Sequence, residues 1–244
     1  MSFPSACCNT PPVVANYTTT GEYGKLGDLD CYFAGTKGSK RGLLISYDIF
    51  GLHPNVLQLC DILGSLGFYV VLPDLLRGTL PTLADLANPE KRRDFIQNAG
   101  SWDASKPAFI EGLKCLRNSG ATSVGLIGFC WGAMLVVRAL GELEGFVGGA
   151  MIHPSMITSE DLTKVGAPLM ALLSKDEDKE MFKKGFEGLK AEKSFGAQCH
   201  LESFEDMTHG FCAARGDWAD PVVSKRASDA IKLQVAFFND IMPK

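Results

Sequence analysis

Compact apolar runs alternate with segments of helical periodicity along most of the chain. Runs that suit buried strands occupy residues 31–34, 42–47, 68–72, 124–127, 146–152, 168–173 and 198–204. Helical patterns occupy residues 54–66, 88–96, 106–116, 131–140, 179–193 and 221–241. Strands that alternate with helices in this way predict an α/β fold, with a mostly parallel central sheet and helices on both faces.

The same pattern predicts one domain that spans residues 1–244. No internal repeat, low-complexity tract or linker divides the chain, and 244 residues suit one large α/β domain. Residues 1–30 are rich in Thr, Gly and Pro, so we expect an irregular lead-in there. Residues 75–105 have a looser pattern, which leaves open whether they form a lid.

Residues 124–140 contain the clearest chemical signal in the chain. A strand pattern ends at Gly128, Cys130 follows, and helical spacing begins near Gly132. A nucleophile on a tight strand-to-helix turn, with glycine two residues away on either side, is the form of the G-x-S-x-G elbow. Cysteine replaces serine here, and a helix N-terminus favours the reactive thiolate. The pattern predicts Cys130 as a nucleophile, the alternative being a small buried thiol.

A catalytic histidine is expected later in the chain, since this fold orders its triad as nucleophile, acid and histidine. His153 ends a predicted strand and His200 lies inside one, so a structural role is expected for both. His209 lies in the loop after the last predicted strand, beside Gly210, where an imidazole has the necessary reach. We therefore predict His209 as the base.

The acid is expected directly after the strand at residues 168–173. Residues 174–178 supply three carboxylates there. Acidic side chains at a helix start are often only favourable partners of the helix dipole, so one of the three is expected to orient the histidine. Spacing alone leaves Asp176 and Asp178 as alternatives.

Two further features complete the predicted site. An oxyanion hole in this fold uses the backbone amide after the nucleophile, here Trp131, and one from the loop after an early strand, for which we choose Ile49. Arg215 follows His209 closely and is expected on the rim of the site. It would bind a substrate carboxylate through a bidentate pair, or it would be a solvated surface arginine.

Composition excludes several classes of protein. The net charge of −4 gives no reason to expect nucleic acid or an anionic membrane as a partner. No apolar run reaches the ~18 residues that span a bilayer, and the N-terminus lacks the pattern of a secretory signal. Eight cysteines without a C-x-x-C pair, and four scattered histidines, indicate neither a metal site nor a disulfide framework. We expect reduced thiols and a cytoplasmic location.

Together these residues resemble the dienelactone hydrolase family, α/β-hydrolases with a cysteine nucleophile. The resemblance covers residues 30–240 and rests on Tyr47–Gly51, Leu72–Asp74, Gly128–Gly132, the acid cluster ending at Asp178, and His209–Phe211. Residues 6–8 (Ala-Cys-Cys) are also similar to the start of fungal members. The resemblance implies an α/β-hydrolase fold and a triad of Cys130, Asp178 and His209. Asp48 stands at the position of the family's thiol-activating glutamate, whereas the family's substrate-binding arginine lies closer to its histidine than Arg215 does to His209.

The implied activity is hydrolysis of a small ester or lactone, such as a dienelactone (carboxymethylenebutenolide), through an acyl-enzyme. No metal and no organic cofactor are expected. One alternative is a general carboxylesterase or thioesterase that acts on other esters. Another is a non-catalytic α/β-hydrolase that binds a ligand, for which a broken triad would be the sequence mark.

Overall fold

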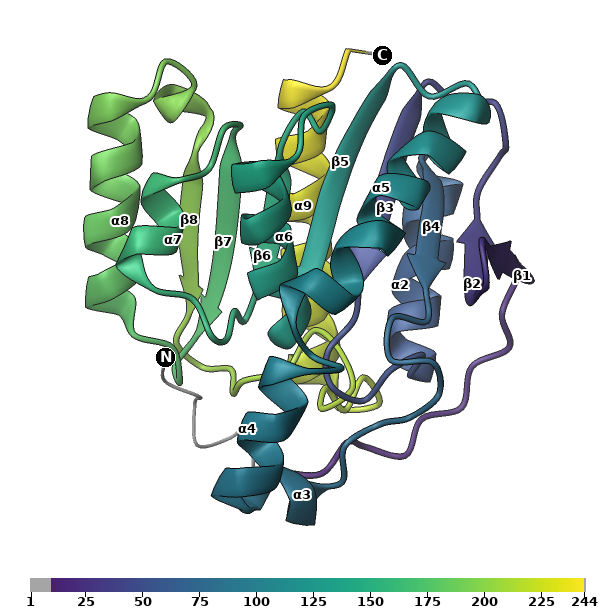
Figure 1. Ribbon diagram of the computed structural model, residues 1–244, viewed down its shortest axis with the longest axis vertical. Coiled ribbons are helices and arrows are strands. Elements are labelled where there is room, and N and C mark those ends of the chain that lie inside the picture. Colours follow the sequence, from purple (N-terminus) through teal and green to yellow (C-terminus); the bar gives the residue numbers. More distant parts are fainter. Residues whose placement is uncertain (1–9, 244) are drawn as a thin grey trace.

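The computed structural model describes residues 10–243 and contains, within them, an eight-stranded sheet in the order β1-β2-β4-β3-β5-β6-β7-β8 (Figure 1). The strands are β1 (Glu22–Leu26), β2 (Leu29–Ala34), β3 (Arg41–Ser46), β4 (Tyr69–Pro73), β5 (Ser123–Phe129), β6 (Gly149–Ile152), β7 (Leu169–Ser174) and β8 (His200–Phe204). From β4 to β8 every neighbouring pair is parallel. Strands β1 and β2 pair antiparallel, as do β2 and β4. The expected mostly parallel sheet is confirmed.

Helices cover both faces of this sheet. They are α2 (Pro54–Ser65), α3 (Leu83–Ala87), α4 (Pro89–Gln97), α5 (Trp102–Asn118), α6 (Trp131–Glu142), α7 (Ser159–Thr163), α8 (Lys179–Glu192) and α9 (Pro221–Ile241), with a 3-10 turn η1 (Gly196–Gln198). Helices α5 to α8 contact one another in sequence and form one layer. Helices α2 and α9 lie behind the sheet in Figure 1 and form the other layer.

The lead-in expected over residues 1–30 is only partly irregular. Strand β1 and the first residues of β2 lie within it and pair from Glu22↔Phe33 to Leu26↔Leu29. The sequence hides β1 because it is an edge strand whose first residues are exposed and polar, so no apolar run marks it. Residues 1–9, which include the Ala-Cys-Cys start, lie outside the described residues.

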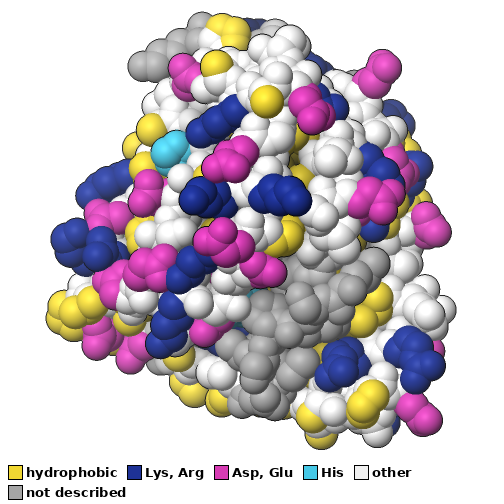
Figure 2. Space-filling model, turned by 90° about the vertical axis from the view of Figure 1, so that its left-hand side faces the viewer, with side chains coloured by type: hydrophobic (Ala, Val, Ile, Leu, Met, Phe, Trp, Pro, Cys, Tyr) yellow, Lys and Arg dark blue, Asp and Glu magenta, His cyan; other side chains and the backbone are white. Residues whose placement is uncertain are grey.

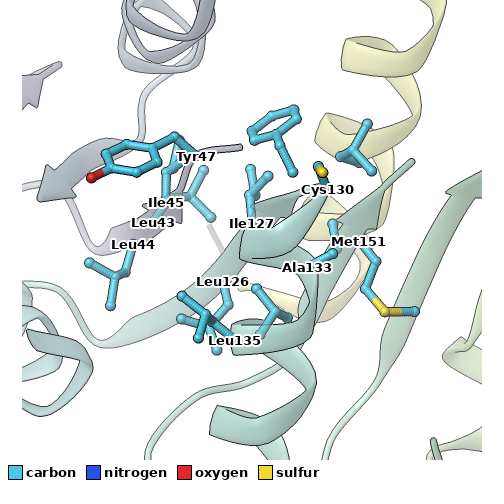
Figure 3. Close-up of a cluster of buried hydrophobic side chains, with 14 of the residues drawn as sticks. Leu43, Leu44, Ile45, Tyr47, Leu126, Ile127, Cys130, Ala133, Leu135 and Met151 are labelled. Atoms are coloured by element: carbon cyan, nitrogen blue, oxygen red, sulfur yellow. The ribbon is translucent and has the colours of Figure 1, made fainter. Parts of the chain in front are cut away.

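The core is most continuous where β3 and β5 meet α6. All residues of β5 are buried, as are Gly42 to Ser46 of β3. Figure 3 shows Leu43, Ile45, Leu126 and Ile127 in one apolar cluster that extends to Cys130 at the end of β5. The nucleophile candidate therefore stands at the end of a fully buried strand.

The sheet topology brings the candidate residues to one edge. Strands β3, β5, β6, β7 and β8 are parallel, so the loops that follow them leave from the same end of the sheet. In Figure 1 this edge faces downward, and α3 and α4 lie below it. Ligands of open α/β sheets bind at such carboxyl ends.

One face of the molecule carries a mixture of acidic and basic side chains. Acidic and basic side chains alternate over the side of the molecule turned to the viewer in Figure 2, where α7 and α8 lie. Within residues 10–243, no helix has both the length and the apolar composition that crossing a membrane requires.

Candidate active site

Cys130 occupies a strained turn between β5 and α6. Its backbone has φ 52° and ψ −113°, a conformation that residues other than glycine rarely adopt. A Cβ atom at Gly128 would lie 2.3 Å from the carbonyl oxygen of Gly132, so only glycine fits there. The turn is thus the predicted nucleophile elbow, and its strain is of the kind found at functional sites.

Gly132 lets α6 approach β3 closely. A Cβ atom at this position would lie 2.4 Å from the carbonyl oxygen of Ser46 and 2.5 Å from that of Tyr47. The hydroxyl of Ser46 donates to the carbonyl of Gly132 across the same contact, at 2.9 Å. This packing holds the loop after β3, which contains Ile49, beside the elbow.

His209 lies in the loop after β8, and its imidazole pairs with a buried carboxylate. The Nδ1 atom is 2.7 Å from Oε1 of Glu177, and the two side chains are 0% and 1% exposed. Both the backbone amide and the hydroxyl of Ser174 donate to the same carboxylate. Glu177 is therefore fixed on one side by Ser174 and directs the imidazole on the other.

Asp176 and Asp178 have different partners from Glu177. One Asp176 oxygen accepts from the backbone amide of His209 at 2.7 Å, which holds the loop rather than the ring. Asp178 is exposed and is the N-cap of α8, where it accepts from the amide of Met181 at 3.0 Å. In place of the predicted Asp178, the structure therefore brings Glu177 against the imidazole of His209. The turn after β7 directs residue 177 inward, while Asp178 satisfies an amide that the helix leaves without a partner.

The two amides predicted for the oxyanion hole come from buried residues at the same edge. Trp131 is the first residue of α6, and the first amides of a helix have no intrahelical acceptor. Ile49 lies in the loop that Gly132 holds against the elbow, and both side chains are fully buried. The use of these amides by a substrate stays a prediction.

Asp48 links the loop after β3 to the His209 loop. Its carboxylate is fully buried and accepts from the amide of Phe50 at 2.9 Å and from that of Ala214 at 3.2 Å. Burial raises the pKa of this carboxyl above its ordinary value, although the two amides oppose the shift. Both loops are thereby tied to one carboxylate.

Arg215 was expected on the rim of the site, but the structure buries it. Its Nε atom donates to the carbonyl of Thr10 at 2.7 Å, and its guanidinium lies 4.7 Å from the centre of the Phe50 ring. The cation remains close enough to Asp48 to oppose the upward shift of that carboxyl's pKa. Arg215 therefore belongs to the same loop assembly as the site.

The segment between β4 and α5 reaches the elbow through one side chain. The indole Nε1 of Trp131 donates to the carbonyl of Gly100 at 2.8 Å, and the Phe95 ring lies 6.1 Å from the Trp131 ring. Helix α4 has no buried residue, whereas Leu86 of α3 is buried in the core. Cys130 itself is 1% exposed.

Sequence reasoning missed two residues at this edge. Glu177 was one of three adjacent carboxylates in the sequence. The preference of Asp for the N-cap position before α8 was the signal that could have excluded Asp178 as the partner of the histidine. His153 was expected to be structural, yet its ring centre lies 5.0 Å from that of His209. Its place at the end of β6, beside the nucleophile strand, was the available signal. Among residues 10–243, no group of three or more His, Cys, Asp or Glu side chains is arranged to hold a metal ion.

Comparisons with known proteins show which sequences and structures this chain resembles. The sequence model described as the Dienelactone hydrolase family matches residues 29–242. An uncharacterised AIM2 family protein of Schizosaccharomyces pombe is 34% identical over 250 residues, which cover 98% of this chain and 100% of that protein. The human carboxymethylenebutenolidase homolog is 22% identical over 207 residues, 83% of each protein.

A solved structure has a similar fold. The crystal structure of a dienelactone hydrolase from Anabaena variabilis matches with a TM-score of 0.62 at 14% identity, over 93% of this chain and 99% of that one. This likeness concerns the fold, which is that of the α/β-hydrolases.

Proposed function

Because the chain belongs to the dienelactone hydrolase family, we propose that this hydrolase cleaves esters or lactones with a triad of Cys130, His209 and Glu177. The buried contact between Glu177 and His209 is the observation that carries the proposal. An imidazole whose Nδ1 is held by a carboxylate has its Nε2 available as a base. The elbow supplies the nucleophile at the carboxyl end of β5, on the same edge of the sheet.

The first half of the reaction acylates the cysteine. His209 takes the thiol proton of Cys130, and the sulfur attacks the carbonyl carbon of the substrate. Glu177 stabilises the imidazolium that forms. The amides of Ile49 and Trp131 donate to the developing oxyanion, each contributing about 3 kcal/mol in sites of this type. The tetrahedral species then releases the enolate or alcohol, which takes the proton from His209, and a thioester remains on Cys130.

The second half releases the acid. His209 accepts a proton from water, whose oxygen attacks the thioester carbonyl. The carbon–sulfur bond breaks, the carboxylic acid leaves, and the proton on His209 balances the thiolate of Cys130. No step requires a metal or an organic cofactor.

An enol-lactone of the dienelactone type is the substrate class that we favour. An enolate departs more readily than a simple alkoxide, which suits a thiolate nucleophile. The family description and the carboxymethylenebutenolidase name of the human relative support this class. Arg215 and Asp48 are proposed to recognise a substrate carboxylate and to aid thiol activation, which fits their place in the loops around the site.

The two alternatives make different predictions. A general carboxylesterase or thioesterase would hydrolyse simple esters such as p-nitrophenyl acetate faster than dienelactone, and Arg215→Gln would change the rates on substrates with and without a carboxylate equally. A non-catalytic binding protein would hydrolyse neither. The described residues contain an assembled nucleophile elbow and a His–Glu pair, which favours an enzyme over a binding protein. We also propose a reducing compartment such as the cytoplasm, because the six cysteines among residues 10–243 are free thiols.

Replacement of the nucleophile tests the proposal. Cys130→Ala is expected to abolish hydrolysis of p-nitrophenyl acetate and of cis- and trans-dienelactone, with an unchanged circular dichroism spectrum. Cys115→Ala, at a half-buried thiol on α5, is the matched control and should keep wild-type turnover. Near-wild-type turnover by Cys130→Ala would overturn the proposal.

A further inference from the structure

His153 is a second buried imidazole that the proposed mechanism does not use. Its side chain is fully buried, and its ring lies edge-to-face with that of His209, with centres 5.0 Å apart and planes at 66°. Phe129 and Phe211 lie 5.9 Å and 6.0 Å away on other sides. An imidazole among aromatic rings, beside the proposed base, requires a physical explanation.

Two features of His153 are energetically unfavourable. Neither ring nitrogen of His153 has a hydrogen-bond partner among residues 10–243, and an unsatisfied buried polar group costs about 1–3 kcal/mol. The backbone at His153 also has φ 38°, which strains a residue other than glycine. A phenyl ring of similar shape would avoid the first of these costs. Unsatisfied groups of this kind in a native protein call for a functional explanation.

The loop that carries His153 is bonded directly to the nucleophile residue. The amide of Cys130 donates to the carbonyl of Ile152, and the amide of Ser155 donates to the carbonyl of Cys130, both at 3.1 Å. The amide of His153 itself donates to Leu172 on β7 at 2.7 Å. His153 is thus fixed between the elbow and the His209 loop.

The titratable and charged groups around the two imidazoles come from every loop at this edge. Asp176 and Glu177 after β7 bond to His209, and Arg215 of the His209 loop acts on His153, while Cys130 of the elbow and Asp48 after β3 lie in the adjoining loops. Burial, reinforced by the nearby cationic forms of His209 and Arg215, lowers the pKa of His153 well below its ordinary value. His153 is therefore neutral while the enzyme works.

A neutral imidazole has a large dipole, with one N–H and one lone pair. In His153 no other described group occupies either end, so the dipole is available to the neighbouring ring. His209 becomes a cation each time it takes the proton of Cys130, and a dipole whose lone-pair end faces such a charge stabilises it strongly in a low-dielectric site. A phenyl ring offers no comparable dipole.

We propose that His153 is a positioning residue for His209, whose neutral dipole stabilises the imidazolium and with it the thiolate of Cys130. This inference rests on the proposed triad and adds a residue to it. No bond of His153 is made or broken. The proton moves only between Cys130, His209 and the substrate or water.

The pH dependence of Cys130 alkylation tests the inference without requiring turnover. Iodoacetamide reacts with the thiolate, and peptide mass spectrometry follows Cys130 alone from pH 5 to pH 9. His153→Phe keeps the ring but removes the dipole, so alkylation at pH 6 should fall about tenfold while the rate at pH 9 is unchanged. His153→Gln supplies a neutral amide dipole and should restore a substantial part of the rate at pH 6.

His200→Phe is the matched control. His200 also has a buried ring nitrogen without a hydrogen-bond partner in residues 10–243, but it is the first residue of β8, at the opposite end of that strand from the loop that carries His209. Its replacement should leave the alkylation profile unchanged. Thermal denaturation of each variant establishes that it is folded, and His153→Met replaces His153→Phe if the latter does not fold.

The outcomes separate this inference from the proposed function. A profile of His153→Phe that overlays wild type would overturn the role of His153 and leave the triad intact. Equal losses in the Phe and Gln variants at every pH would also overturn it, because packing alone would explain them. A wild-type Cys130 without thiolate reactivity at pH 6 would overturn the triad and this inference together.

Discussion

His209 lies between two loops of opposite character. On one side, the loop after β7 presents the buried carboxylate of Glu177, which is satisfied by Ser174 and by the imidazole itself. On the other side, the loop after β6 presents His153, which is equally buried and has no hydrogen-bond partner in the described residues. The difference shows that burial alone does not determine what a polar group costs, since the partner decides it.

The largest expected effect comes from removing the carboxylate of Glu177, the hydrogen-bonded partner of His209. Glu177→Ala leaves Nδ1 of His209 and the donors of Ser174 without their acceptor. Loss of one partner of a buried pair typically costs about 3 kcal/mol or more. We expect the free energy of unfolding at pH 7, measured by urea denaturation, to fall by this amount. A loss under ~1 kcal/mol would mean that the pair is not buried in solution.

The buried, neutral imidazole of His153 should make the stability of the protein depend on pH. The pKa of His153 is well below the ordinary value in the folded protein, so the unfolded chain binds a proton first as the pH falls. The folded state therefore keeps its full stability above about pH 6.5 and loses up to about 1.4 kcal/mol per pH unit below it.

Replacement of His153 removes this contribution. Between pH 7 and pH 5, His153→Phe should lose about 2 kcal/mol less stability than wild type does. Urea denaturation of both proteins at pH 7, 6 and 5 measures the difference. Parallel curves would show that His153 is accessible to protons in the folded state.

The smallest expected effect is that of His153→Phe on stability at pH 7. At pH 7, His153→Phe replaces an unsatisfied imidazole with an apolar ring of similar shape, which is neutral or stabilising by up to about 1 kcal/mol. The thermal midpoint should therefore stay the same or rise, although activity falls. Such a trade of function for stability is expected at a strained functional residue. A large loss of stability would instead show that the imidazole nitrogens make structural hydrogen bonds.

The elbow was predictable from sequence because its requirements are local. Gly128 and Gly132 are needed where a Cβ atom would collide with backbone, and an apolar strand and helix flank them. His209 was predictable in the same way, because it lies in a loop after a strand, beside Gly210. The mostly parallel sheet followed from the alternation of elements.

The acid and β1 were not predictable by the same reasoning. The choice among Asp176, Glu177 and Asp178 depends on which way a turn directs each side chain and on the position of Ser174, and neither is a property of spacing. Strand β1 is formed by pairing with β2, because its own residues have no apolar run. In both places tertiary contacts override the local pattern.

The identity of the acid is the central claim, and one paired measurement tests it. Glu177→Gln and Asp178→Asn each remove one negative charge and keep the side-chain shape, so kcat of the two variants on p-nitrophenyl acetate can be compared directly. Glu177→Gln should lose about 10³- to 10⁴-fold, because the imidazole is no longer held in the right tautomer. Asp178→Asn should stay within about twofold of wild type, because Asn caps a helix as well as Asp does. The reverse result, with a large loss in Asp178→Asn and near-normal turnover in Glu177→Gln, would contradict the account.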